Sequence, residues 1–359
     1  MKIAFTTGGF HRSGGTERVG TLIANALADK GYDVTIMSFA RVQKPFYALD
    51  KRVRHKAILP YFFWRLRRFE KLALWAAHRH YCREQFDVVI DIDDISSYFT
   101  LKALKGLQTK HVAWDHFNYL EVEKDPERQR AVDMVINYSN ALVLLTQKDV
   151  ELYNQHYTIK KGLIHQIYNP ISFDSVRFLK HSSKVVIAAG HLNEAKGFDV
   201  LLRIWALVEQ KVSGWQLFIY GDGALEDALK SEATFLNLRN VCFKGRTNDM
   251  LNAYKNAAIY ALSSRHEGFP MVLLEAMAMS LPMVAFNCPT GPSEMVEDGK
   301  NGFLIPAFDE KQFAEKLIVL MQNEELRYSM SVASYQTSQK YLLDNIVTQW
   351  DQLLQSMIK

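Results

Sequence analysis

The chain has 359 residues, 48% of them hydrophobic and 23% charged, a balance that is typical of a folded globular protein and excludes extended disorder. Because a single hydrophobic core stops growing at about 250–300 residues, the length predicts two domains. The net charge of +4 is unevenly spread, since residues 52–84 carry nine Lys and Arg against two acids and the rest of the chain is slightly acidic.

The three cysteines, Cys82, Cys242 and Cys288, lie too far apart for a disulfide framework or a metal-ligand spacing, and they favour a reducing compartment. The N-terminus has no apolar signal-peptide region, and no run of 18 apolar residues occurs in the chain. We therefore expect a cytoplasmic protein that is neither secreted by that route nor membrane-spanning.

The first half of the chain alternates between strand and helix patterns. Residues 2–7 form a predicted strand, a glycine-bearing loop follows, and the apolar spacing after it predicts a helix that ends at Gly31. Further strands are predicted at residues 33–39, 87–92, 111–114 and 141–145. This order is typical of a parallel sheet with crossover helices. Asn169 and Pro170 mark a break, so the first domain is predicted to end at residue 170.

A second alternation begins at Lys184, after a polar linker. Helices are predicted at residues 198–209 and 270–280, and the apolar stripe of residues 342–359 predicts a terminal helix that packs on another element. Strands are predicted at residues 185–189, 215–220, 241–244, 259–262 and 283–286. We expect two doubly wound α/β domains, with the ligand site outside the carboxyl ends of their strands, in a cleft between the domains.

Residues 264–282, SRHEGFPMVLLEAMAMSLP, place two acids around a Gly-Phe-Pro turn and a short apolar helix. Pro270 suits the first turn of this helix, and Glu275 lies inside it, where a buried carboxylate needs donors such as ligand hydroxyls. Eight residues separate it from Glu267, about 12 Å along a helix, which is the span of a nucleoside with part of a sugar diphosphate. The free amides at the helix start suit a phosphate. The alternative is that both acids form surface ion pairs.

The segment EGFPMVLLE resembles the Glu-x7-Glu motif of the retaining glycosyltransferases of family 4, which have the GT-B fold of two Rossmann-like domains. Five further blocks resemble this family in the same order: GGTER (14–18), AGHLNEAKGFDVLL (189–202), GDGALEDAL (221–229), FKGRTNDML (243–251) and GPSEMVEDGKNGFLIP (291–306). The resemblance implies an acceptor-binding domain at residues 1–170 and a nucleotide-sugar donor domain at residues 171–340. It also implies that the helix at 341–359 packs back on the first domain.

Carried over to this sequence, the resemblance implies that Glu267 contacts donor-sugar hydroxyls beside the reacting carbon and that Glu275 holds the ribose hydroxyls. Lys196 would neutralise the diphosphate as negative charge develops on it. Gly14 and Gly15 would bring backbone amides to the same diphosphate. The other donor-binding residues implied are His191, Arg246, Gly268, Phe269, Pro270 and Met271.

Two histidines are candidates in this scheme. The family usually has an arginine where this chain has His191, which can donate one hydrogen bond to a phosphate or instead cap the backbone of its loop. His116 follows a predicted strand, where the family often places a histidine near the donor sugar, and we expect it to be catalytic. The alternatives there are its neighbour Asp115 and a structural histidine.

The segment Asp91-Ile92-Asp93-Asp94 contains an Asp-x-Asp pair, which is the metal motif of another glycosyltransferase fold. Because Lys196 and helix dipoles would supply the positive charge, we expect no metal and no cofactor. A second possible role for these acids is contact with acceptor hydroxyls. The glycines near the N-terminus lack the G-x-G-x-x-G spacing of a dinucleotide site.

Residues 60–83 mix arginines with seven aromatic side chains. Such a basic, aromatic helix suits an anionic membrane surface, so we expect peripheral attachment to the inner face of the cell membrane, near a lipid-linked acceptor. The alternatives are an amphipathic helix packed on the sheet and binding to nucleic acid, which we do not expect because no recognition module accompanies the segment.

The sequence thus predicts a retaining glycosyltransferase that moves a hexose or N-acetylhexosamine from a nucleotide-diphosphate sugar, with a UDP-sugar expected, to a glycan, lipid-linked glycan, lipopolysaccharide or capsule acceptor. One alternative is a sugar-nucleotide epimerase or a phosphorylase on the same fold. Another is a non-catalytic protein that binds glycans or sugar nucleotides at a membrane.

Overall fold

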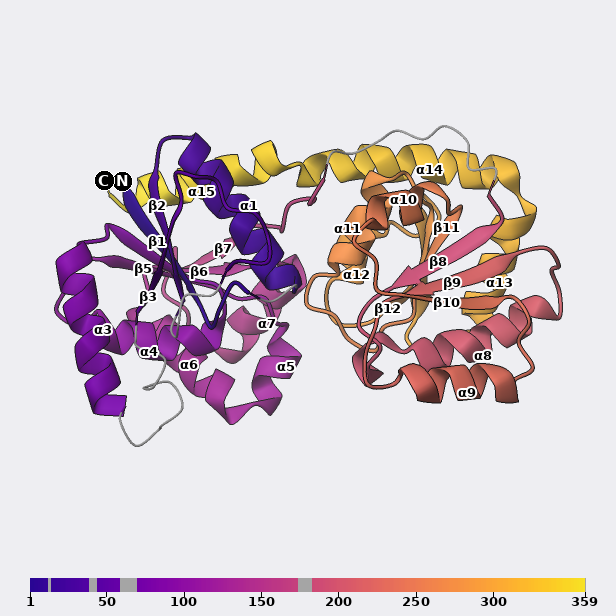
Figure 1. Cartoon of the computed structure of the whole chain (residues 1–359), viewed down its shortest axis with the longest axis horizontal. Helices are drawn as coiled ribbons and strands as arrows, with labels where there is room; N and C mark the ends of the chain where they lie inside the picture. The colour runs from indigo at the N-terminus through magenta and orange to yellow at the C-terminus, as the bar shows by residue number, and fades with distance from the viewer. Residues whose placement is uncertain (12–13, 39–43, 59–69, 174–182, 359) are drawn as a thin grey trace. The chain divides into compact units, whose positions relative to one another are not determined.

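The computed structural model describes residues 1–11, 14–38, 44–58, 70–173 and 183–358. The chain divides into two compact units, one formed by Met1–Ser172 with Leu343–Lys359 and the other by Phe173–Leu342 (Figure 1). The division after Ser172 lies two residues beyond the boundary expected at residue 170. Among the described residues, no helix is both long and apolar enough to cross a membrane.

The first unit is built on a seven-stranded sheet in the order β3-β2-β1-β4-β5-β6-β7, and every pairing in it is parallel. The central strand β1 (Lys2–Thr7) is buried along nearly its whole length, as strands covered on both faces must be. The remaining strands are β2 (Asp33–Ser38), β3 (Arg54–Ala57), β4 (Val88–Asp91), β5 (Lys110–Trp114), β6 (Ala141–Leu144) and β7 (Ile164–Gln166).

Helices of the first unit connect these strands. They are α1 (Gly15–Asp29), α3 (Glu70–Glu84), α4 (Asp94–Ala103), α5 (Tyr119–Lys124), α6 (Pro126–Tyr138), α7 (Gln147–His156) and α15 (Leu343–Ser356). The terminal helix α15 buries an apolar stripe in this unit, and its Trp350 ring packs edge-on against Trp114 with 4.7 Å between ring centroids. The Tyr32 hydroxyl donates a hydrogen bond to Asp351 and ties the same helix to the start of β2.

The second unit contains a six-stranded parallel sheet in the order β10-β9-β8-β11-β12-β13. Its strands are β8 (Val185–Ala189), β9 (Gln216–Tyr220), β10 (Val241–Gly245), β11 (Ile259–Leu262), β12 (Met283–Asn287) and β13 (Gly302–Pro306). Its helices are η2 (Glu194–Lys196), α8 (Phe198–Glu209), α9 (Glu226–Phe235), α10 (Met250–Lys255), α11 (Met271–Ala278), α12 (Pro292–Met295), α13 (Glu310–Gln322), α14 (Glu324–Ser338) and η3 (Gln339–Tyr341). Two such sheets confirm the predicted α/β class.

Three short strands were not predicted from the sequence. β3 has the polar sequence RHKA, β7 has three residues, and β13 begins with glycine and ends with proline. β3 and β7 are the edge strands of the first sheet, and β13 is an edge strand of the second. An edge strand pairs with a neighbouring strand on one side only. Edge strands need less burial than central ones, so their sequences carry a weaker apolar signal.

Candidate functional site

The loop after β11 carries Glu267 at the carboxyl edge of the second sheet. Its backbone forms an isolated parallel bridge with Thr290, in which the Glu267 amide donates to the Pro289 carbonyl at 2.8 Å and the Thr290 amide donates to the Glu267 carbonyl at 2.7 Å. The side chain is 7% exposed. Glu267 therefore lies on an extended segment before α11, so the expected helical span of about 12 Å to Glu275 does not apply.

The carboxylate of Glu267 is paired with a lysine from another loop. The Lys196 ammonium lies 2.8 Å from each carboxylate oxygen, and the Ser264 hydroxyl donates to Oε1 at 2.6 Å. Lys196 ends η2, which follows β8, and its side chain keeps 26% exposure. The structure thus brings together two predicted site residues from elements 71 positions apart. A buried carboxylate needs such partners, because an unpaired charge away from water is costly.

Glycines allow the backbone around this pair to pack closely. A Cβ on Gly291 would lie 2.8 Å from the Gly268 carbonyl oxygen and 3.0 Å from the Cα of Phe269, so only glycine permits this approach. A Cβ on Gly190 would lie 3.3 Å from Cγ of Lys196, so the aliphatic stem of the lysine lies against this position. The loop geometry thus depends on a close backbone approach at Gly291 and on room for the lysine stem at Gly190.

Glu275 lies in the second turn of α11 and is 4% exposed. Its Oε2 accepts a hydrogen bond of 2.9 Å from the Tyr254 hydroxyl of α10. Neither this acid nor Glu267 is therefore a surface ion-pair residue. Tyr254 was not predicted as a site residue, and a single buried tyrosine in a short helix carries no sequence signal that could have found it.

The N-terminus of α11 lies between the two acids. Pro270 is its N-cap residue, and among the described residues no side-chain hydrogen bond caps it. The Phe269 ring is buried and packs against Tyr341 with 6.1 Å between centroids, so its side chain has a packing role. Met271 begins the helix and is half-buried, which leaves backbone amides of this turn as the groups that suit a phosphate.

His191 and Arg246 both follow strands of the second sheet at its carboxyl edge. His191 comes shortly after β8; its side chain is 68% exposed, and its Nδ1 lies 2.5 Å from the Asp222 carbonyl oxygen. This contact caps the neighbouring loop, as one of the two interpretations expected. Arg246 directly follows β10 and is exposed. Both side chains lie on the sheet edge that also carries Glu267.

His116 follows β5 in the first unit. Its ring lies 4.6 Å from the Trp114 ring, and its buried Nε2 has no hydrogen-bond partner within the described parts of the chain. Burial lowers the pKa of His116 to about 4, so the imidazole is neutral at pH 7. The neighbouring Asp115 is buried and accepts hydrogen bonds from the Phe117 amide at 2.9 Å and the Tyr153 hydroxyl at 2.7 Å. Asp115 therefore shapes the loop that presents His116.

The predicted glycine loop lies at the start of α1. Gly14 is extended and precedes the helix, Gly15 is its first residue, and both are exposed. No side-chain hydrogen bond from the described residues caps this 15-residue helix. An exposed helix start without a side-chain cap suits an anion.

The two acids of the Asp-x-Asp pair have separate partners. Asp91 is fully buried, lies 2.8 Å from Nε2 of His111 and accepts a hydrogen bond of 3.0 Å from the Thr100 hydroxyl. Asp93 caps α4 and pairs with Arg128 at 3.0 Å. Across the described ranges, no group of three or more His, Cys, Asp or Glu side chains is placed to hold a metal ion.

Two family models match the chain. Residues 172–337 match the family described as Glycosyl transferases group 1, and residues 13–175 match Glycosyltransferase Family 4. An uncharacterized glycosyltransferase of Haemophilus influenzae is 34% identical over 358 residues, which is 98% of this chain and 99% of that protein.

Two further proteins are similar over almost their full length. The first is a Campylobacter jejuni enzyme named GalNAc-alpha-(1->4)-GalNAc-alpha-(1->3)-diNAcBac-PP-undecaprenol alpha-1,4-N-acetyl-D-galactosaminyltransferase, which is 27% identical over 99% of this chain and 98% of that protein. The second is the crystal structure of HepE from Anabaena in complex with UDP-glucose, which has a TM-score of 0.79, covers 99% of this chain and 100% of that one, and is 20% identical.

Proposed function

The chain belongs to the family 4 glycosyltransferases with the GT-B fold, and we propose that it transfers a hexose or N-acetylhexosamine from a nucleotide-diphosphate sugar, specifically a UDP-sugar, to a lipid-linked glycan or a lipopolysaccharide or capsule acceptor. The observation that carries this proposal is the Lys196–Glu267 pair beside the N-terminus of α11. The undecaprenol-linked acceptor in the name of the Campylobacter enzyme supports the lipid-linked acceptor, and the UDP-glucose in the Anabaena complex supports the UDP-sugar.

In the proposed reaction an acceptor hydroxyl attacks the anomeric carbon on the face that the diphosphate leaves. The carbon–oxygen bond to the phosphate breaks, the new glycosidic bond forms, and the hydroxyl proton passes to a phosphate oxygen of the leaving group, so the configuration is retained. Lys196 stabilises the charge that develops on the diphosphate, and Glu267 binds hydroxyls of the donor sugar. The mechanism needs no metal because Lys196 and helix amides supply the positive charge.

In the second unit, the proposed donor contacts lie along α11 and at the turn before it. Glu275 binds the ribose hydroxyls, and the amides of residues 268–271 approach the sugar and the diphosphate. His191 and Arg246 add donors to the diphosphate. In the first unit, the roles expected for Gly14, Gly15 and His116 stay predictions, and His116 is a neutral imidazole. A crystal structure with a bound UDP-sugar tests these contacts.

Nucleotide release from UDP-sugars, measured with and without a membrane extract, tests the proposed activity. We expect release that depends on the acceptor in the extract and that falls at least 100-fold in Glu267→Ala and Lys196→Ala. Conversion of the donor to an epimer without release would support an epimerase. Binding of a UDP-sugar that raises the melting temperature, but without turnover in any extract, would indicate a non-catalytic binding protein.

We also propose that the protein works in the cytoplasm, attached to the anionic inner face of the cell membrane. Residues 60–69 of the predicted basic segment at 60–83 lie outside the described residues. In the described helix α3, Ala73, Ala77 and Tyr81 are buried, so this part of the segment packs on the sheet as one alternative expected.

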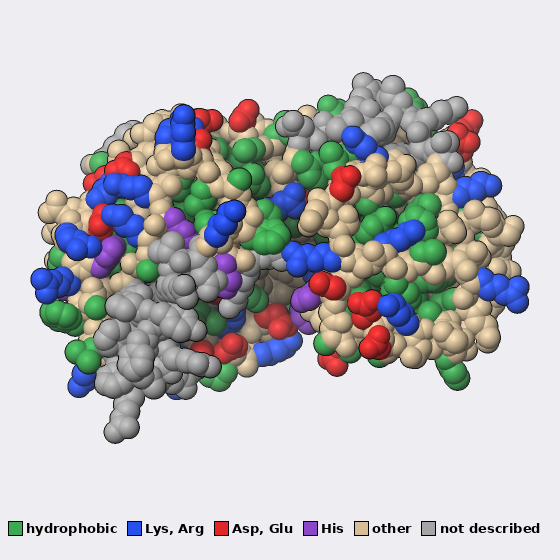
Figure 2. Space-filling view, in the orientation of Figure 1, with side chains coloured by type: hydrophobic (Ala, Val, Ile, Leu, Met, Phe, Trp, Pro, Cys, Tyr) green, Lys and Arg blue, Asp and Glu red, His purple; other side chains and the backbone are tan. Residues whose placement is uncertain are grey.

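The opposite face of α3 supports the membrane proposal. Trp75 is 60% exposed and Leu72 is 51% exposed, and the Arg79 guanidinium lies 5.6 Å from the centroid of the Trp75 ring. Hydrophobic and basic side chains are exposed together at the left edge of Figure 2, over the region of α3. Exposed aromatic and basic side chains on one helix face are typical of an interfacial helix.

Flotation with liposomes tests this attachment. We expect recovery with vesicles that contain anionic lipid, a large loss with the double variant Leu72→Ser, Trp75→Ser, and little recovery with neutral vesicles. The matched control is Tyr138→Ser, which removes another exposed aromatic side chain, 68% exposed on α6. Equal recovery of wild type with neutral and anionic vesicles would contradict the proposal.

A further inference from the structure

The turn η2, which ends at Lys196, is hydrogen-bonded along one side to residues 263–265. All three carbonyls of the one-turn helix η2 accept hydrogen bonds from Ser263 and Arg265. The Arg265 guanidinium donates to Glu194 at 2.7 Å, the Arg265 amide donates to Ala195 at 2.8 Å, and the Ser263 hydroxyl donates to Lys196 at 3.0 Å. The backbone of Lys196 is therefore fixed to the segment that leads into Glu267.

Gly197 brings the two segments into direct contact. It follows η2 with a φ of +62°, and a Cβ at this position would lie 2.2 Å from the Ser263 carbonyl oxygen. A side chain here would meet rigid backbone rather than a flexible group, so the contact admits only glycine. The close approach places the turn where the three hydrogen bonds from Ser263 and Arg265 can form.

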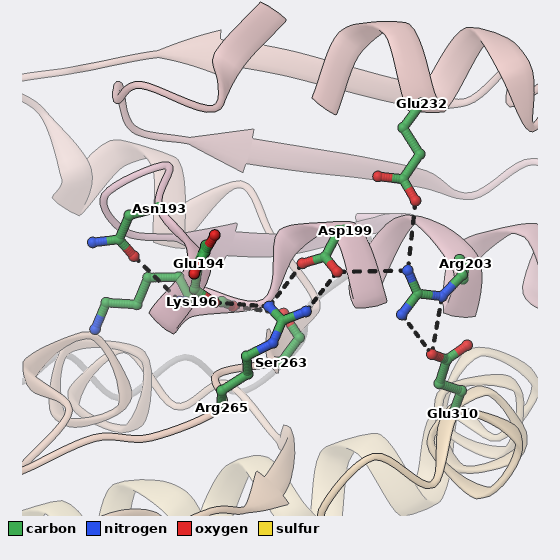
Figure 3. Close-up of polar contacts among 9 residues, drawn as sticks. All are labelled: Asn193, Glu194, Lys196, Asp199, Arg203, Glu232, Ser263, Arg265 and Glu310. Atoms are coloured by element: carbon green, nitrogen blue, oxygen red, sulfur yellow. Dashed lines mark hydrogen bonds and ion pairs between the residues drawn. The ribbon is translucent and has the colours of Figure 1, made fainter. Parts of the chain in front are cut away.

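An ion pair sets the orientation of the Arg265 side chain. Nη1 and Nη2 lie 2.8 and 2.6 Å from the two carboxylate oxygens of Asp199, in the first turn of α8. Figure 3 shows the guanidinium between this carboxylate and the η2 turn. Such a two-point contact needs the planar guanidinium fork, which a lysine ammonium cannot reproduce.

We propose that Arg265 is a positioning residue of the transfer reaction, because its contacts with Asp199 and η2 fix the backbone from which Lys196 reaches Glu267 and the donor diphosphate. This inference rests on the proposed role of Lys196 in that reaction. Since the backbone of the turn is held, the ammonium moves only through its side-chain torsions, between the Glu267 carboxylate and the diphosphate. A misplacement of about 1 Å at such a group costs about 100-fold in rate.

A test that needs no substrate is the reactivity of the Lys196 amine toward limiting acetic anhydride, measured by peptide mass spectrometry. The amine must leave Glu267 before it reacts, so a mobile turn makes it more reactive. We expect Arg265→Met and Asp199→Asn to raise acetylation of Lys196 at least threefold, while other lysines change little. Arg265→Lys keeps the charge but loses the fork, and we expect it to resemble Arg265→Met.

Arg203→Met is the matched control. Arg203 belongs to the same network, contacting Asp199 at 3.5 Å, Glu232 at 3.5 Å and Glu310 at 2.8 Å, but these partners are side chains rather than the carbonyls of η2 (Figure 3). We expect its loss to leave the labelling of Lys196 unchanged. An equal rise in Arg203→Met and Arg265→Met, or no rise in Arg265→Met and Asp199→Asn, would overturn the proposal.

A double-mutant cycle on turnover separates positioning from general destabilisation. We expect Arg265→Met to lower kcat about 10- to 100-fold with a smaller change in the KM of the donor, and to have less than a twofold effect when Lys196 is already replaced by Ala. A full 10-fold loss in the Lys196→Ala background would refute action through Lys196. Changed labelling without any glycosyl transfer by wild type would instead refute the proposed function and leave the contact between Arg265 and η2 standing.

Discussion

The Lys196 ammonium lies 2.8 Å from both carboxylate oxygens of Glu267. The two residues are proposed to bind different parts of the donor, and without a donor they neutralise each other. This pairing stabilises a carboxylate that is only 7% exposed. If the proposed roles hold, a donor supplies both a diphosphate for the lysine and sugar hydroxyls for the acid. A nucleoside diphosphate alone offers only the first, and a free sugar offers only the second.

Removal of one member of this pair should be costlier for folding than removal of both. We expect Lys196→Met to lower the free energy of unfolding by about 1–2 kcal/mol, because it removes the cation that neutralises a buried carboxylate. The double variant Lys196→Met, Glu267→Gln should recover most of this loss and remain inactive. Denaturant titration and nucleotide-release assays measure the two effects. A double variant less stable than Lys196→Met would contradict the pairing.

Glu275 gives a prediction on binding rather than on chemistry. If it holds the ribose, Glu275→Gln should raise the KM for a UDP-sugar about 10-fold or more with a smaller change in kcat, since a neutral amide accepts weaker hydrogen bonds than a carboxylate. The control is Tyr254→Phe, which removes the 2.9 Å hydrogen bond to Glu275 but keeps the carboxylate. We expect it to cost about 1 kcal/mol of stability with a smaller effect on KM. Equal KM values for Glu275→Gln and wild type would rule out the ribose contact.

The close contact at Gly197 predicts a severe effect of one methyl group. Gly197→Ala must strain a φ of +62° and also push the Ser263 carbonyl aside, so we expect a loss of at least 3 kcal/mol or failure to fold, on the order of a buried steric clash. Gly299→Ala is the matched control, because its φ of +74° is similar while no described atom lies within 4 Å of its Cβ. It should cost only about 1 kcal/mol. Similar melting temperatures for the two variants would contradict this account.

The central strands and long helices could be predicted because burial imposes a strong apolar pattern on them. The helix expected at residues 198–209 has the bounds of α8, and the strand expected at residues 185–189 has those of β8. The edge strands β3 and β7 could not be predicted, because a polar or three-residue edge strand carries no such pattern.

The candidate site was predictable to the extent that its residues belong to sequence blocks. Glu267, Glu275 and Lys196 lie in such blocks, and the structure places the first and last of them in contact. Arg265 and Tyr254 were missed because their roles depend on partners 66 and 21 positions away, which no local spacing reveals. Asp91 was singled out for its Asp-x-Asp spacing, yet its partner His111 lies on the neighbouring strand β5 and makes it part of the core.

His116 predicts how stability depends on pH. Burial lowers its pKa to about 4, below the ordinary value of about 6.5. Between pH 4 and pH 6.5 this histidine is therefore mainly protonated in the unfolded chain and mainly neutral in the folded chain. Stability is therefore full above about pH 6.5 and falls as the pH falls toward 4. We expect this residue to account for a loss of about 2–3 kcal/mol across that window, and His116→Gln to remove that part of the loss.

The neighbouring carboxyl acts in the opposite direction and supplies the control. Burial raises the pKa of Asp115, so its contribution to stability grows as the pH falls, and Asp115→Asn should make the loss of stability at low pH steeper than in wild type. Denaturant titrations at pH 7 and pH 5 measure both effects. A His116→Gln protein that loses as much stability as wild type between these pH values would show that folding does not lower the pKa of His116, and would contradict this account.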